Sequence, residues 1–204
     1  GLGLKTASMS QCQSFSVASR TSNEIKNIAA FCWDLSHIEK TNKWEILPPK
    51  KKEVIAFLHD PLDEHTGTVV LWERLDRILG FKHPYGEPAR KKLISMCREL
   101  EDYLAMVFHK FLANETTKQN LEIYLNWNKI KPWDPFARTE PETKELSPIK
   151  FKLNHEGVSG KLLLQPYILP TKEEFSSPDS FKCASGPANW NQQQGFYIYR
   201  ANRM

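Results

Sequence analysis

The stretch from Gly1 to Ser8, Gly-Leu-Gly-Leu-Lys-Thr-Ala-Ser, constrains this chain more than any other. Its two glycines and its lysine stand directly before Thr6 to Gln11, a run of small residues that suits a helix. Glycine lets backbone N–H groups approach an anion closely, and a helix N-terminus and a lysine add positive charge. The pattern therefore predicts a phosphate cradle at the start of a helix, with Lys5 as the contacting side chain.

Two better-known phosphate motifs do not fit this stretch. A Rossmann fingerprint needs a third glycine where Thr6 stands, and a Walker A loop needs a glycine directly before Lys5, where Leu4 stands. A short Gly-x-Gly-x-Lys pattern alone leaves another interpretation open, in which an ordinary glycine turn carries a solvent-exposed Lys5.

Strand patterns follow the glycine stretch. Serines alternate with Phe15 and Val17, as in a half-buried strand, and a β-branched and aromatic run begins at Thr66. Proline pairs, polar clusters and lysines separate these runs. The strands predicted are Ser14–Arg20, Ile28–Leu35, Trp44–Leu47 and Thr66–Trp72, with a hairpin turn at Thr21–Glu24.

A connector rich in glycine and proline, Glu73 to Gly86, predicts a domain boundary near residue 80. Beyond it, apolar residues recur at spacings of three and four, which predicts one helix from Pro88 to Ala113, roughly 38 Å long. Leu121 to Leu125 alternates as a strand does, and Asn126 to Lys129 suits a hairpin turn. Further strands are predicted at Lys150–Leu153, Lys161–Leu169 and Phe196–Tyr199, and surface loops at Pro132–Ser147 and Ser176–Gln194.

Composition bounds the class of protein. With 204 residues, of which 40% are hydrophobic and 11% aromatic, the chain can form a packed core. A net charge of +4 permits contact with nucleic acid without arguing for it. Four scattered cysteines favour neither a zinc site nor a disulfide framework, and no apolar run is long enough to cross a bilayer, so we expect a cytoplasmic protein.

Two other groups of residues were weighed for chemistry. The densest set of potential metal ligands, His59, Asp60, Asp63, Glu64 and His65, matches no metal-binding spacing and is interpreted as a polar surface loop. A second group consists of aromatic residues near lysines and an arginine, and such side chains can stack on unpaired bases. Packing in a core or in a subunit contact is the more ordinary interpretation. This second group comprises Trp127, Trp133, Phe136 and Trp190.

The run from Gly1 to Cys12 closely resembles the second glycine box of the GHKL ATPases, the superfamily of gyrase, Hsp90-type chaperones, histidine kinases and MutL. Within it, the run is most similar to the MORC group and its bacterial relatives. Three later stretches match in the same order: Gly67–Val70, Leu121–Phe136 and Gly195–Arg203. In the second of these stretches Trp127 replaces the usual glycine of a turn.

The resemblance implies an α+β fold. Residues 1–80 would be the C-terminal half of a GHKL (Bergerat) ATP-binding α/β sandwich, and residues 81–204 a transducer-like domain of the ribosomal protein S5 domain 2 type. It implies ATP and Mg²⁺ as cofactors, with the metal ligand and the catalytic glutamate in a family segment upstream of this chain. The implied nucleotide-binding residues are Gly1, Leu2, Gly3, Leu4, Lys5 and Thr6 at the phosphates and Thr68 near the adenine.

The same resemblance implies a function for the longer protein to which this chain would belong. That protein would be a slow Mg-dependent ATPase and an ATP-gated homodimeric clamp in DNA-related or defence processes, and this chain alone would be catalytically inactive. A non-catalytic nucleic-acid- or protein-binding module with a vestigial nucleotide site is the alternative. A pure dimerisation scaffold is the third possibility.

Overall fold

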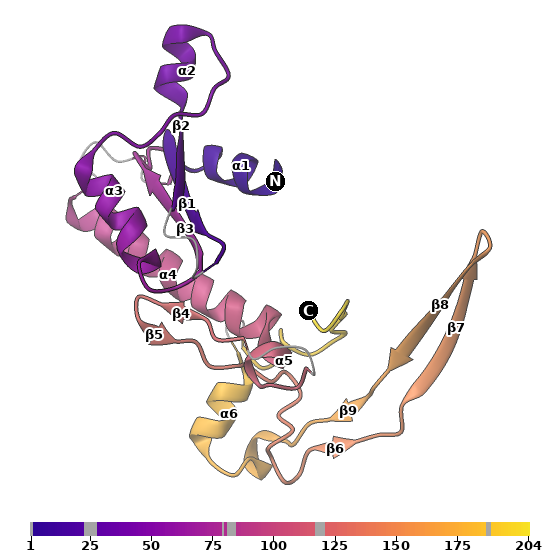
Figure 1. Ribbon diagram of the computed structural model, residues 1–204. Helices are drawn as coiled ribbons and strands as arrows, with labels where there is room; N and C mark the ends of the chain where they lie inside the picture. Colours follow the sequence, from indigo (N-terminus) through magenta and orange to yellow (C-terminus); the bar gives the residue numbers. More distant parts are fainter. Residues whose placement is uncertain (1, 23–27, 79, 81–84, 117–120, 187–188) are drawn as a thin grey trace. The chain divides into compact units, whose positions relative to one another are not determined.

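The computed structural model describes residues 2–22, 28–78, 80, 85–116, 121–186 and 189–204 (Figure 1). The chain divides into two compact units, Gly1–Lys91 and Lys92–Met204. Helices and antiparallel strands occur in both units, so the predicted α+β class is confirmed at this coarse level.

A three-stranded antiparallel sheet forms the centre of the first unit. Its strands are β1 (Ser14–Arg20), β2 (Ala29–Asp34) and β3 (Gly67–Glu73), in the order β2-β1-β3. These are three of the predicted strands, which confirms the alternation as a signal here. Two residues of the predicted turn, Asn23 and Glu24, lie outside the described residues.

One face of this sheet is covered by a helix that the sequence did not predict. Helix α3 (Lys52–His59) and the 3-10 turn η1 (Asp60–Leu62) follow the lysine run. Ala18 of β1 and Leu58 of α3 are fully buried, and they pack with Leu62 as the core of the unit. The hydrophobic contact between α3 and the sheet thus closes this face.

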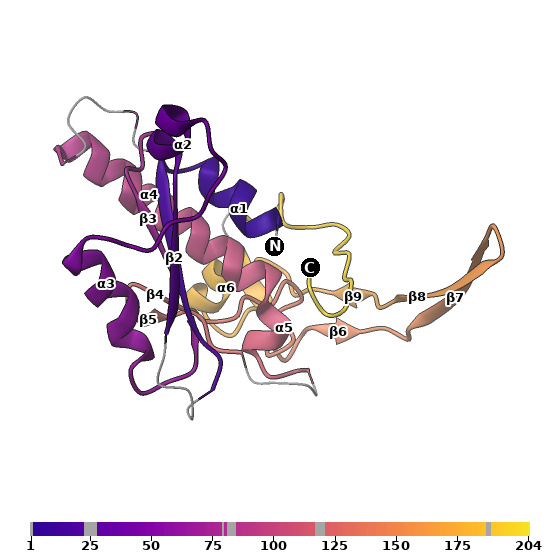
Figure 2. The same cartoon turned by 45° about the horizontal axis from the view of Figure 1, so that its top comes forward.

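Helix α1 (Leu2–Met9) lies on the opposite face of the sheet, as Figures 1 and 2 both show. The predicted helix begins at Thr6, whereas α1 begins four residues earlier and includes Leu2 to Lys5 of the glycine stretch. The first N–H groups of any helix need no intrahelical acceptor, and the Thr6 hydroxyl donates to the Leu2 carbonyl at 2.9 Å, which ties the first turn. The expected loop is therefore the first turn of a helix.

Helix α2 (Leu35–Thr41) directly follows β2 and is capped by Asp34, whose carboxylate accepts the Ser36 N–H at 2.9 Å. Burial opposes ionisation of Asp34, but the Arg74 guanidinium, 2.6 Å away, and the capping N–H groups outweigh it and hold the pKa of this carboxyl below its usual value. The strand predicted at Trp44–Leu47 is reduced to one bridge, in which Leu47 pairs with Cys32.

The single long helix predicted for Pro88–Ala113 is divided in the structure. Helix α4 (Glu87–Val107) ends at Phe108, whose φ of −106° and ψ of 14° leave the helical region, and α5 (His109–Leu112) follows. The break turns His109 into the core of the second unit, where it is 1% exposed. Tertiary packing there overrides the apolar periodicity.

The hairpin turn predicted at Asn126–Lys129 is confirmed. Strands β4 (Tyr124–Leu125) and β5 (Asn128–Lys129) pair across Asn126 and Trp127, whose φ values of +48° and +68° define a type I′ turn. Trp127 is 96% exposed, so it does not pack in the core, whereas a subunit contact or base stacking by this ring stays a prediction. The predicted strand from Leu121 is shortened to its last two residues.

A longer hairpin of the second unit has two unlike faces. Strands β7 (Ile149–His155) and β8 (Val158–Leu164) pair along their whole length, and β6 (Lys144–Glu145) pairs with β9 (Tyr167–Ile168). The register places the apolar side chains Ile149, Phe151, Leu153, Val158, Leu162 and Leu164 on one face. The other face carries Lys150, Lys152 and Lys161, together with Leu163 opposite Lys150.

An aromatic cluster forms much of the packing of the second unit. Phe136 stacks on Tyr167 at 4.4 Å between ring centroids, and Tyr199 contacts the His109 ring at 5.5 Å. The strand predicted at Phe196–Tyr199 joins no ladder in the structure, although Tyr197 and Tyr199 still point inward while Phe196 and Ile198 are exposed.

The two predicted surface loops contain regular structure. Strand β6 lies within the predicted loop Pro132–Ser147. Helix α6 (Pro178–Ala184) lies within the predicted loop Ser176–Gln194, and the turn η2 (Lys172–Glu174) precedes it. The α6 helix is held by Phe181, which packs between Phe175 and Trp190.

Candidate functional site

The candidate site lies on the side of the central sheet that carries α1, which we call the α1 face. Alternate residues of a strand share a face, and residues directly opposite in a ladder point the same way. Pairing of Phe15 with Trp33 and Trp72, and of Ser19 with Thr68, therefore fixes which side chains this face presents. They are Phe15, Val17 and Ser19 of β1, Phe31 and Trp33 of β2, and Thr68, Val70 and Trp72 of β3.

Helix α1 is attached to this face through its last turn. Ser8 is fully buried, and its hydroxyl accepts a hydrogen bond from the indole N–H of Trp72 at 2.9 Å. The buried Cys12 thiol donates to the Ser8 carbonyl at 3.1 Å, and burial raises the pKa of this thiol. Arg77, beyond β3, donates to the Met9 carbonyl at 2.7 Å. The helix is thus tied to the sheet at its C-terminal end.

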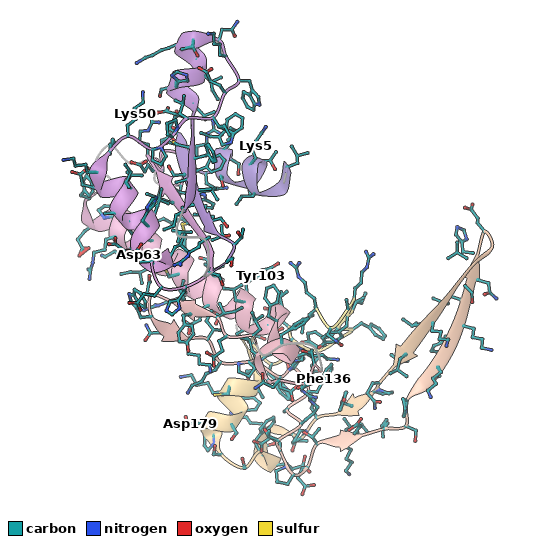
Figure 3. The ribbon with its side chains drawn as sticks, in the orientation of Figure 1. Lys5, Lys50, Asp63, Tyr103, Phe136 and Asp179 are labelled. Atoms are coloured by element: carbon teal, nitrogen blue, oxygen red, sulfur yellow. The ribbon has the colours of Figure 1, made fainter. Side chains whose placement is uncertain are left out.

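Lys5 belongs to α1 (Figure 3), and its ammonium lies over the ring of Trp33 in strand β2. Its ammonium nitrogen lies 4.6 Å from the ring centroid of Trp33 and 4.5 Å from that of Trp44. The two indole rings are 4.9 Å apart and inclined at 53° to one another. Both distances are within the range of cation–π attraction, so the lysine is held by two aromatic rings.

The other predicted phosphate-binding residues form the exposed first turn of α1. Leu2, Gly3 and Leu4 are exposed, and their N–H groups belong to the helix N-terminus, which favours anions. A Cβ at Gly3 would meet nothing within 4 Å, so no described residue crowds this turn. Thr6 is exposed and bonded to the turn itself, and Gly1 lies outside the described residues.

Thr68 lies on the same face as Lys5, at the other end of the sheet. Its hydroxyl is 3.1 Å from that of Ser19, which also contacts the Gly67 carbonyl. Trp33, beneath Lys5, pairs with Phe15, and Thr68 pairs with Ser19. Four residues of β1 separate these positions, which is roughly 13 Å at the rise of a strand. The fold thus brings both ends of the predicted site to one face.

The donor set of this face fits phosphate groups better than it fits a metal ion. A helix N-terminus and an ammonium are ordinary phosphate partners. Residues 2–22, 28–78 and the later described segments contain no group of three or more His, Cys, Asp or Glu able to hold a metal ion. In the polar cluster predicted to be a surface loop, His59 ends α3 and Asp60 begins η1.

The second unit contains a cavity of its own. Its volume is about 640 Å³, and its lining includes Phe175 and Phe181 with Lys172 and Lys182. None of the predicted nucleotide-binding residues lines it. The candidate site is therefore a sheet face with a helix beside it, and it is chosen on chemistry and not on concavity.

None of the described helices combines the length and the apolar character that crossing a bilayer requires.

Comparisons with known proteins gave one match. Residues 1–68, one third of the chain, match the family model described as histidine kinase-, DNA gyrase B-, and HSP90-like ATPase. No curated protein and no solved structure matched the chain. The matched segment contains α1, β1, β2, α3 and Thr68. Over these residues the chain is similar to the GHKL-type ATPases, which agrees with the superfamily resemblance of its glycine stretch.

Proposed function

We propose that this chain supplies part of the ATP site of a MORC-like GHKL ATPase, an ATP-gated dimeric clamp acting in DNA-related or defence processes. The observation that carries the proposal is the placement of Lys5 and Thr68 on one face of the sheet, with the N-terminal turn of α1 beside Lys5 in the chain. In this proposal residues 1–80 belong to the ATP-binding domain and residues 81–204 to a transducer-like domain.

The residues of the α1 face have separate roles in this proposal. Lys5 neutralises charge on the phosphates, and the N–H groups from Leu2 to Leu4 add the attraction of a helix N-terminus. Thr68 offers a hydroxyl to the adenine end. Bound Mg·ATP would supply the energy of phosphoryl transfer, and its binding would select the closed state of the clamp.

Steady-state ATP hydrolysis by the full-length protein tests this proposal. We expect slow Mg-dependent turnover that Lys5→Ala reduces about 10-fold or more, because hydrogen bonds to charged groups contribute about 1.5–3 kcal/mol. Lys40→Ala is the matched control, since Lys40 is an exposed lysine of α2 outside the α1 face. Turnover and ATP binding indifferent to Lys5→Ala would refute the assignment of this face.

A specific observation favours the alternative of a nucleic-acid-binding module. Lys152 and Lys161 stand directly opposite each other on the β7–β8 hairpin, with Lys150 on the same face. Like charges facing each other across a ladder repel unless an anion lies over them. Binding of DNA that weakens with salt, falls on Lys152→Glu and ignores both ATP and Lys5→Ala would support this alternative.

A further inference from the structure

We propose that Trp33 and Trp44 are positioning residues that hold the ammonium of Lys5 ready for the phosphates of the nucleotide. This inference rests on the proposed function, because it concerns the same site. It assigns a role to two residues that stand 28 and 39 positions after the lysine in the sequence.

Both rings are fixed by the structure around them. Trp33 belongs to β2 and pairs with Phe15 of the central strand. Trp44 follows α2, and the residues after it anchor its segment: Glu45 contacts His37 at 2.8 Å, and Leu47, three positions on, exchanges backbone hydrogen bonds of 2.7 and 2.9 Å with Cys32. The pair of rings is therefore a preformed feature of the first unit.

The charge of Lys5 remains available to an anion. Within the described residues no carboxylate forms an ion pair with Lys5, whereas Lys51 pairs with Glu73. The rings attract the ammonium through their π-faces but carry no negative charge that would neutralise it, so the positive charge stays available to an anion. Because the rings are inclined to each other and not parallel, the ammonium lies against a V-shaped pair of surfaces.

The two tryptophan rings would help binding by lowering an entropic cost. A lysine side chain has several rotatable bonds, and fixing it on a ligand costs binding free energy. Two cation–π contacts already order the lysine side chain in the free protein, so less conformational entropy is lost when the ligand binds. Removing one ring should therefore weaken phosphate binding by about 3- to 30-fold without changing which groups contact the ligand.

The test compares ATP, ADP and adenosine binding to the full-length protein by calorimetry, for wild type, Trp44→Ala, Lys5→Ala and the double variant. Trp44 is 59% exposed, so the fold should tolerate its removal, and Trp44→Leu provides a second variant that keeps apolar volume. We expect weaker ATP binding in Trp44→Ala, unchanged adenosine binding, and no further loss when Lys5→Ala is added. Trp44→Phe should retain most of the affinity.

Phe57→Ala is the matched control, because Phe57 is an aromatic residue of similar exposure (58%) on α3, which covers the opposite face. If the wild type binds no ATP, the proposed function itself fails. If Lys5→Ala weakens ATP binding and Trp44→Ala does not, only the positioning role of the tryptophan rings is refuted. If Trp44→Ala weakens adenosine binding as much as ATP binding, the rings hold the base. If Trp44→Ala tightens ATP binding, the rings compete with phosphate for the ammonium. Either result overturns the positioning role of the rings.

Discussion

Replacing Trp127 by glycine should stabilise the second unit. Trp127 has φ +68° in the type I′ turn between β4 and β5, where glycine is the preferred residue. The left-handed conformation costs an L-residue about 1–2 kcal/mol. The indole is 96% exposed, so its removal forfeits almost no buried contact.

The expected gain is smaller than the strain it relieves. Glycine also increases the conformational entropy of the unfolded chain, which offsets about 0.4–1 kcal/mol. The free energy of unfolding should thus rise by roughly 0.5–1 kcal/mol. With a urea dependence of about 1–3 kcal/mol per molar, the midpoint should move upward by about 0.2–1 M.

Urea unfolding followed by far-ultraviolet circular dichroism measures this change without depending on tryptophan fluorescence. Trp127→Ala is the decisive control, because alanine removes the indole but keeps a Cβ and therefore keeps the backbone strain. Alanine should give no stabilisation. Equal midpoints for the alanine and glycine variants would refute the strain argument and assign the effect to the exposed ring.

Two further predictions concern the buried cores. Leu58→Ala should lower the free energy of unfolding of the first unit by about 2–5 kcal/mol, since Leu58 is fully buried against Ala18, and Phe57→Ala on the same helix should cost much less in the same urea titration. His109 should make the second unit less stable in acid. Burial lowers its pKa below 6.5, so as the pH falls from about 6.5 toward the folded pKa the unfolded chain binds the proton first and stability is lost. Nearby Asp134, Glu115, Arg138 and Lys110 modulate this pKa. The slope of unfolding free energy against pH in that window should flatten in His109→Gln, and an unchanged slope would show that other groups cause it.

Local patterns predicted the elements whose stability is decided locally. Ser14–Arg20 alternates cleanly and is β1, and Asn126 and Trp127 form the predicted turn. Helix α6 was missed because proline and glutamines suggested a loop, although Ser177 before Pro178 is a helix start: the Ser177 hydroxyl accepts the Ser180 N–H at 3.0 Å. Its remaining support, the packing of Phe181, comes from residues distant in the sequence.

The candidate site likewise combines features that local sequence predicts with features that depend on residues distant in the sequence. The residue types and spacing of Gly1 to Ser8 were sufficient to propose phosphate chemistry and to select Lys5, and the family resemblance selected Thr68. Their common face depends on the register between β1 and β3, which joins residues about 50 positions apart. The contact of Lys5 with Trp33 and Trp44 has no local signal either, because rings on a strand and in a loop meet a helix only after the sheet has formed.

By itself, then, the sequence determined the α+β class and strand β1, whose alternation is uninterrupted, because these follow from backbone preferences within a few residues. It also predicted the side chains that we propose for phosphate binding. Tertiary structure alone decided that the long helix breaks at Phe108 and that two indoles enclose the ammonium of Lys5. These outcomes depend on long-range packing, whose free energy exceeds local propensity and leaves no trace in a short window of sequence.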